Sequence, residues 1–142
     1  MELNFYHVAE GNLISSVIRL LEKVYVSEQR CIFFSPLEER VKVVDKMLWT
    51  FSTNAFIPHG DKSLGFREKQ PIYFANEIEN PNNAEVLVIA DSLDYKLWNN
   101  FERVFLIFEE KTDNTWSTYS RLKNSQENVN YWKQLVKGWE KL

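Results

Sequence analysis

The sequence has only one cysteine, Cys31, and two histidines in 142 residues. A single cysteine excludes a disulfide framework or a cysteine-based metal cluster within one chain, which fits a reducing compartment. Two histidines without cysteine partners give a weak case for a metal site. We therefore expect no metal, no cofactor and a cytoplasmic location.

The sequence also has no large excess of either charge and no long apolar run. The formal net charge is −3, so the chain as a whole does not attract nucleic acid, although a local basic patch is not excluded. The N-terminal residues lack the basic segment and apolar run of a signal peptide, and no apolar stretch approaches the length of a bilayer span. We expect neither membrane contact nor strong direct binding to nucleic acid.

Glycine is scarce as well, with four in the chain, and this bears on nucleotide binding. Gly11 stands alone at an expected strand-to-helix turn, whereas a phosphate-cradling loop needs several glycines. The G-x-S-x-G, Walker A and H-E-x-x-H motifs are absent too. One alternative for the whole chain is a small α/β nucleotide-binding protein or enzyme. Its site would lie at the carboxyl ends of the strands, near Glu10, Gly11 and Asp91.

What the sequence does contain is a series of short apolar segments that alternate with amphipathic ones. Strands are predicted at residues 3–8, 30–34, 71–75, 85–91 and 103–109. Three of them have unbroken apolar runs, which are typical of strands covered on both faces. We predict one α/β domain over residues 1–142, with three layers and a mostly parallel, mixed sheet of about five strands. It would resemble a Rossmann fold without a nucleotide fingerprint, and the short link after residue 75 leaves room for an antiparallel hairpin.

Three helical stretches would cover the two faces of that sheet. Asn12 can cap a helix over residues 13–26. A second helix has a start signal in which Ser35 caps, Pro36 takes the first helical position and Glu38 completes a capping box. Its expected buried stripe is Leu37, Val41, Val44 and Leu48. The chain from about residue 114 is predicted to be helical, with a possible break near residues 124–125.

A few polar residues are candidates for chemistry. His7 alternates with apolar residues, which favours a buried and hydrogen-bonded histidine over a catalytic one. Asp91 follows a strand at a position where α/β sheets place functional carboxylates, but it is more simply the cap of a following helix. Cys31 is expected to be a small buried hydrophobe. No nucleophile or base motif accompanies these residues.

Aromatic residues gather where the second helix must end. Trp49 and Phe51 lie in its last turns, and Phe56, Pro58 and His59 follow a short polar loop. Pro58 stiffens the loop, and rings on a stiff loop make a good docking surface. From the residues alone, Trp49 and Phe56 are more simply expected to close one end of the core.

The same corner carries a resemblance to a known family. One block runs over residues 44–51 and continues over residues 56–60, and a second runs in order through residues 71–72, 80–88 and 101–105. With residues 4–6 near the start, these blocks resemble, in order and spacing, the chi subunit of bacterial DNA polymerase III. The resemblance covers nearly the whole chain, and the combination of blocks is specific.

This resemblance implies a non-catalytic accessory subunit of the polymerase III holoenzyme that bridges two partners. One partner would be the psi subunit, which ties chi to the clamp loader, or a helicase that uses the same surface. The resemblance assigns Trp49, Phe51, Phe56, Pro58 and His59 to this partner surface, in place of the core role expected from the residues alone.

The other implied partner is the acidic C-terminal tail of the single-stranded-DNA-binding protein. The family holds this tail on its last helix, where basic residues neutralise carboxylates and an apolar notch accepts a terminal aromatic. The residues that could serve here are Arg121, Lys123, Tyr131, Lys133 and Lys137. The arginines usual in that helix are missing, and ordinary solvated lysines are the alternative.

Overall fold

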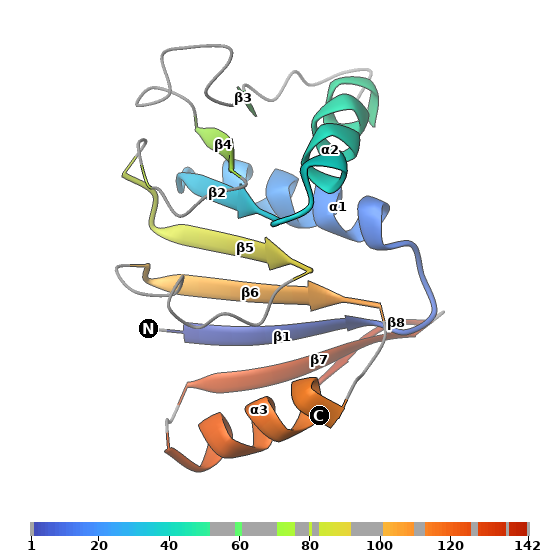
Figure 1. Ribbon diagram of the computed structural model, residues 1–142, viewed down its shortest axis with the longest axis vertical. Helices are drawn as coiled ribbons and strands as arrows, with labels where there is room; N and C mark the ends of the chain where they lie inside the picture. The colour runs from blue at the N-terminus through green and yellow to red at the C-terminus, as the bar shows by residue number, and fades with distance from the viewer. Residues whose placement is uncertain are drawn as a thin grey trace.

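The computed structural model describes residues 2–51, 59–60, 71–75, 80, 83–91, 101–109, 113–125, 128–135 and 137–141. Within these residues the sheet has eight strands in the order β3-β4-β2-β5-β6-β1-β7-β8 (Figure 1). The strands are β1 (Glu2–Val8), β2 (Cys31–Phe34), β3 (His59–Gly60), β4 (Ile72–Ala75), β5 (Val86–Ala90), β6 (Arg103–Phe108), β7 (Val129–Leu135) and β8 (Gly138–Lys141). The helices are α1 (Leu13–Val26), α2 (Glu38–Phe51) and α3 (Asp113–Ser125).

Two apolar clusters, one on each face of the sheet, hold three layers together. Val17 of α1 and Val44 of α2 pack with Phe105 on one face. Tyr119 of α3 packs with Phe5 and Tyr131 on the other face. The predicted class, α/β with helices on both faces of a mostly parallel sheet, is therefore confirmed, with eight strands in place of about five.

The pairing of β4 and β5 differs from the hairpin that the short link allowed. Both strands run parallel to β2 and flank it, so that Cys31 pairs with Ile72 on one side and with Val86 on the other. The chain between them therefore crosses to the far side of β2. The sheet is mixed because β8 runs antiparallel to β7 at one edge.

The C-terminal segment is the main correction to the expected secondary structure. Helix α3 ends at Ser125, and the following residues form the β7–β8 hairpin, not a helix. Val129 and Tyr131 are buried on the α3 side, and the residues between and beside them are less buried, which is the period of a strand. Gly138 has φ +132 at the hairpin turn, a value that favours glycine.

The predicted start of the first helix is confirmed, whereas the second helix begins later than its sequence predicted. The Asn12 side chain caps α1 by accepting a hydrogen bond from the Ser15 amide at 2.9 Å. In α2, Ser35 Oγ accepts from the Leu37 amide at 3.1 Å, but the helix begins only at Glu38. Leu37 therefore precedes the helix and is 51% exposed, whereas the rest of the predicted stripe is buried.

Candidate functional site

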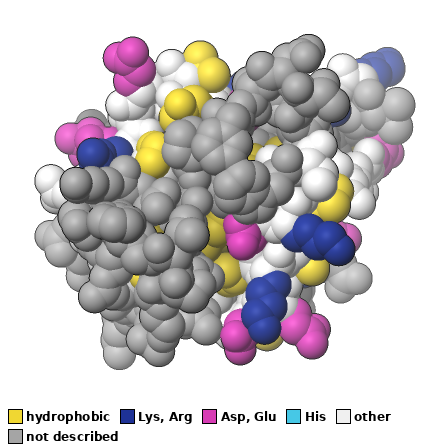
Figure 2. Space-filling model, turned by 90° about the horizontal axis from the view of Figure 1, so that it is seen from above, with side chains coloured by type: hydrophobic (Ala, Val, Ile, Leu, Met, Phe, Trp, Pro, Cys, Tyr) yellow, Lys and Arg dark blue, Asp and Glu magenta, His cyan; other side chains and the backbone are white. Residues whose placement is uncertain are grey.

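The outward face of α2 carries apolar side chains. Val41, Val44 and Leu48 face the sheet and are buried, whereas Val43 and Met47 are 46% and 41% exposed. Figure 2 views the molecule from above and shows hydrophobic side chains that reach the surface between charged ones. Exposed apolar side chains that share a helix face are typical of a surface that another protein covers.

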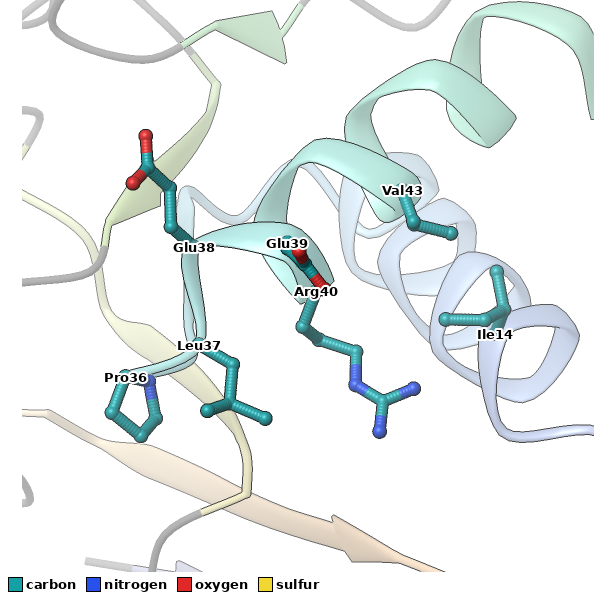
Figure 3. A pocket seen from close by; sticks show the side chains of 7 residues that line it. All are labelled: Ile14, Pro36, Leu37, Glu38, Glu39, Arg40 and Val43. Carbon is teal, nitrogen blue, oxygen red and sulfur yellow. The ribbon is translucent and has the colours of Figure 1, made fainter.

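A cavity of about 490 Å³ continues this apolar surface at the start of α2. Ile14 of α1 and Val43 of α2 lie near each other across the gap between the helices (Figure 3). Leu37 and Arg40 point toward the same open space, whereas Glu38 points away from it. The cavity is therefore apolar at its wall and charged at its rim.

Asp91 lies beside this cavity and ties β5 to the start of α2. Its carboxylate accepts hydrogen bonds from Arg40 Nε at 3.0 Å and from Arg40 Nη2 at 3.1 Å. Ser35 Oγ donates to the same carboxylate at 2.8 Å. The helix that Asp91 was predicted to cap lies outside the described residues. These contacts explain Asp91 as a structural link between two strand ends and a helix.

Glu10 and Gly11 lie in the β1–α1 turn, where both contact Gln134 of β7. The Glu10 amide donates to the Gln134 carbonyl at 3.2 Å. A Cβ at Gly11 would overlap the side-chain amide of Gln134, which in turn accepts a hydrogen bond from Ser16 Oγ at 3.0 Å. The glycine thus permits close approach of the turn to β7. These contacts with β7 explain the positions of Glu10 and Gly11 without a bound phosphate.

The predicted aromatic corner lies mostly beyond what the structure describes. The backbone places Trp49 and Phe51 in the last turns of α2. The backbone of His59 pairs in parallel with Ile72 at the β3 edge of the sheet. Phe56 and Pro58 fall outside the described residues, as do the side chains of the other three. Their role as a partner surface stays a prediction.

The five residues predicted to hold an acidic tail lie on three different elements. Arg121 and Lys123 are on α3, Tyr131 and Lys133 are on β7, and Lys137 is in the hairpin turn. Lys123 Nζ donates to the Val129 carbonyl at 2.9 Å, which draws this lysine toward β7. Within the described residues, therefore, only Arg121 and Lys123 belong to the last helix.

Tyr131 is a core residue, 0% exposed. Its ring meets Tyr119 edge-on, with centroids 5.1 Å apart, and burial raises its pKa to about 12. Its hydroxyl lies 3.1 Å from Nδ1 of His7, whose Nε2 lies 3.1 Å from the Glu109 carbonyl. The prediction of a buried, hydrogen-bonded His7 is confirmed. Cys31 is likewise 0% exposed, and burial raises the pKa of its thiol well above the usual range.

A cleft of about 420 Å³ between α1 and the β7–β8 hairpin escaped the sequence analysis. Tyr6, Trp132 and Trp139 line it, with Arg19 and Lys23 on the α1 side. The sequence predicted a helix here, because Trp132 and Trp139 lie seven residues apart, which is about two helical turns. The alternation of Val129, Asn130 and Tyr131 was the signal that could have revealed the strand.

Two further observations bear on the class of protein. None of the described helices is long and apolar enough to cross a bilayer. In the described ranges there is no group of three or more histidine, cysteine, aspartate or glutamate side chains placed to hold a metal ion.

Comparisons with known proteins agree with the resemblance. The family described as "DNA polymerase III chi subunit, HolC" matches residues 1–128. A Rickettsia prowazekii (strain Madrid E) protein named "Probable DNA polymerase III subunit chi" is 38% identical over 93 residues. That match covers 66% of this chain but only 56% of the relative. The family match ends just before β7, so the β7–β8 hairpin lies beyond it.

Proposed function

Because this chain belongs to the family of DNA polymerase III chi subunits, we propose that it is a non-catalytic accessory subunit that bridges two proteins during DNA replication. The observation that carries this proposal is the exposed apolar pair Val43 and Met47 on α2, the helix whose last turns hold Trp49 and Phe51. An enzyme of this fold would instead use the strand ends, where Gly11 and Asp91 already have structural partners.

The first proposed partner is the psi subunit, or a helicase that uses the same surface. It would contact the end of α2 and the loop beyond it through Trp49, Phe51, Phe56, Pro58 and His59. The exposed side chains of Val43 and Met47 on the same helix, and of Leu37 just before it, support a wider apolar contact. The carboxylate of Glu39 at the rim of the neighbouring cavity favours a basic group on that partner.

A psi binding measurement tests this surface. We expect Trp49→Ala to weaken psi binding by about thirtyfold or more, because an interfacial tryptophan is a typical hot spot worth about 2 kcal/mol. Thr50→Ala, at the neighbouring exposed position, is the control and should leave the dissociation constant unchanged. Wild-type affinity in the Trp49 variant, with the fold intact by circular dichroism, would reject this assignment.

The second proposed partner is the acidic tail of the single-stranded-DNA-binding protein. Arg121 and Lys123 of α3, together with Lys133 and Lys137 of the hairpin, would attract its carboxylates. Tyr131 would act from below, as the buried ring on which α3 rests, and would not touch the tail. Attraction of this kind weakens as salt rises.

Calorimetry with a synthetic tail peptide at low salt separates the two groups of cations. If the last helix holds the tail, Arg121→Glu with Lys123→Glu weakens binding more than Lys133→Glu with Lys137→Glu does. Both double variants change the net charge equally, so a general charge effect would give equal losses. Unchanged affinity in both would remove this partner site.

A further inference from the structure

Neither proposed partner surface uses the cleft between α1 and the β7–β8 hairpin. The cleft lies on the face of the sheet opposite α3, where Tyr6 packs against the α1 cluster. The ring of Tyr6 meets Trp139 at a centroid distance of 4.8 Å and Trp132 at 6.4 Å. Trp139 remains 39% exposed. Three rings from three strands thus form one partly open floor.

Cations border this aromatic floor on both sides. Arg19 and Lys23 are exposed on α1 and lie four residues apart, which places them on the same helix face. On the hairpin side, Lys141 Nζ lies 5.5 Å from the centroid of the Trp132 ring. Within the described residues, none of the three cations is paired with a carboxylate. The cleft is therefore basic in a chain whose net charge is −3.

We propose that this cleft binds single-stranded nucleic acid. A base would stack on the exposed indole of Trp139, and the phosphates would follow Arg19, Lys23 and Lys141. Aromatic platforms beside cations bind single strands in this way and tolerate any base, because every base has a flat face. The aromatic lining of the cleft favours this ligand over an acidic peptide with an aliphatic anchor. Leu20 is the one aliphatic side chain among the lining residues described, so the cleft offers little to such an anchor.

Fluorescence anisotropy with a labelled oligothymidylate and the full chain at low salt tests the proposal. Arg19→Glu with Lys23→Glu should abolish binding, and Trp139→Ala should weaken it about tenfold through the lost stacking. Lys42→Glu with Lys46→Glu is the matched control, because it makes the same charge change on exposed positions of α2. Three phosphate contacts predict a slope of about −2 when the logarithm of the binding constant is plotted against that of salt.

The outcomes decide the matter in either direction. Loss in the cleft variants with near wild-type binding in the α2 control supports the nucleic-acid site. Equal losses in the two charge-reversal variants would overturn it, because they indicate general electrostatics. So would no binding by the wild-type chain at low salt, or a cleft that takes an acidic peptide and no oligonucleotide. None of these results depends on psi or on the tail peptide, so the proposed function is judged separately.

Discussion

Tyr131 and Trp132 are adjacent in the chain, yet their side chains lie in opposite environments. Tyr131 is sealed beneath α3 with Phe5 and Tyr119, whereas Trp132 is half-buried in the open cleft beside α1. The difference comes from the strand period, which sends neighbours to opposite faces of the sheet. It also comes from the layers, because α3 packs against β7 on one face only. Aromatic content alone therefore does not separate core from surface.

The sharpest test of this contrast is the stability cost of removing each ring. Tyr131→Ala should lower the free energy of unfolding by about 3–5 kcal/mol, as for large aromatic side chains in cores. Trp132→Ala should cost about 1–2 kcal/mol, because its ring keeps part of its solvent contact. Urea denaturation at neutral pH measures both values. Similar costs for the two variants would contradict the difference in burial.

A second test uses the Tyr131 hydroxyl and pH. Burial raises the pKa of Tyr131 from 10.0 to about 12, so the folded state holds this proton more tightly than the unfolded state does. The contribution of protonated Tyr131 to the stability of the folded state is therefore fully present below pH 10 and declines as the pH rises toward 12. Tyr131→Phe should cost about 1 kcal/mol at neutral pH, through the lost hydrogen bond to His7.

The variant should also lose less stability than the wild type between pH 10 and pH 12, because it lacks the buried titrating group. Denaturation midpoints measured across this interval check the expectation. Parallel decline of the two proteins would show that other groups govern the alkaline transition. Tyr6→Phe on the cleft side should change the pH dependence in the same direction, because burial also raises the pKa of Tyr6.

The smallest expected effect concerns the side of β7 that carries Trp132. Gly11→Ala forces the Gln134 side chain away and breaks its hydrogen bond with Ser16, at a cost of about 0.5 kcal/mol because the end of that side chain can move. In a Gln134→Ala background the same substitution should be nearly neutral, because the overlapping atoms are gone. A double-mutant cycle in urea measures this coupling. If the stability losses of the two substitutions were additive, Gly11 would matter for its backbone conformation and not for its close approach to Gln134.

Local signals in the sequence predicted much of the fold. The apolar period of α1 and its Asn12 cap, and the unbroken runs of β2, β5 and β6, correspond to elements of the structure. The strand order was not predictable in this way, because β4 and β5 meet β2 through contacts between distant segments. Local propensity carries no information on which of two sides a strand takes.

The C-terminal hairpin was missed because its apolar spacing fits two periods at once. Val129, Trp132 and Trp139 recur at helical intervals, but Val129 and Tyr131 also alternate as a strand requires. Pairing with the buried strand β1 decides between them. The same error placed Tyr131 among surface residues and hid the cleft. The aromatic corner after α2, by contrast, rests on the family resemblance and remains a prediction.

The position of β1 between β6 and β7 has a consequence for biosynthesis. Glu2 pairs with Arg103, and Leu3 pairs with Val129, so β1 acquires its two neighbours only after the distant strands β6 and β7 have been made. Until then its apolar side chains have no sheet to join, and nascent chains in this condition are open to misassociation. Contacts between such distant segments also slow the final closure of a sheet. We expect a chaperone to be needed most before the segment from β6 to β7 has been translated.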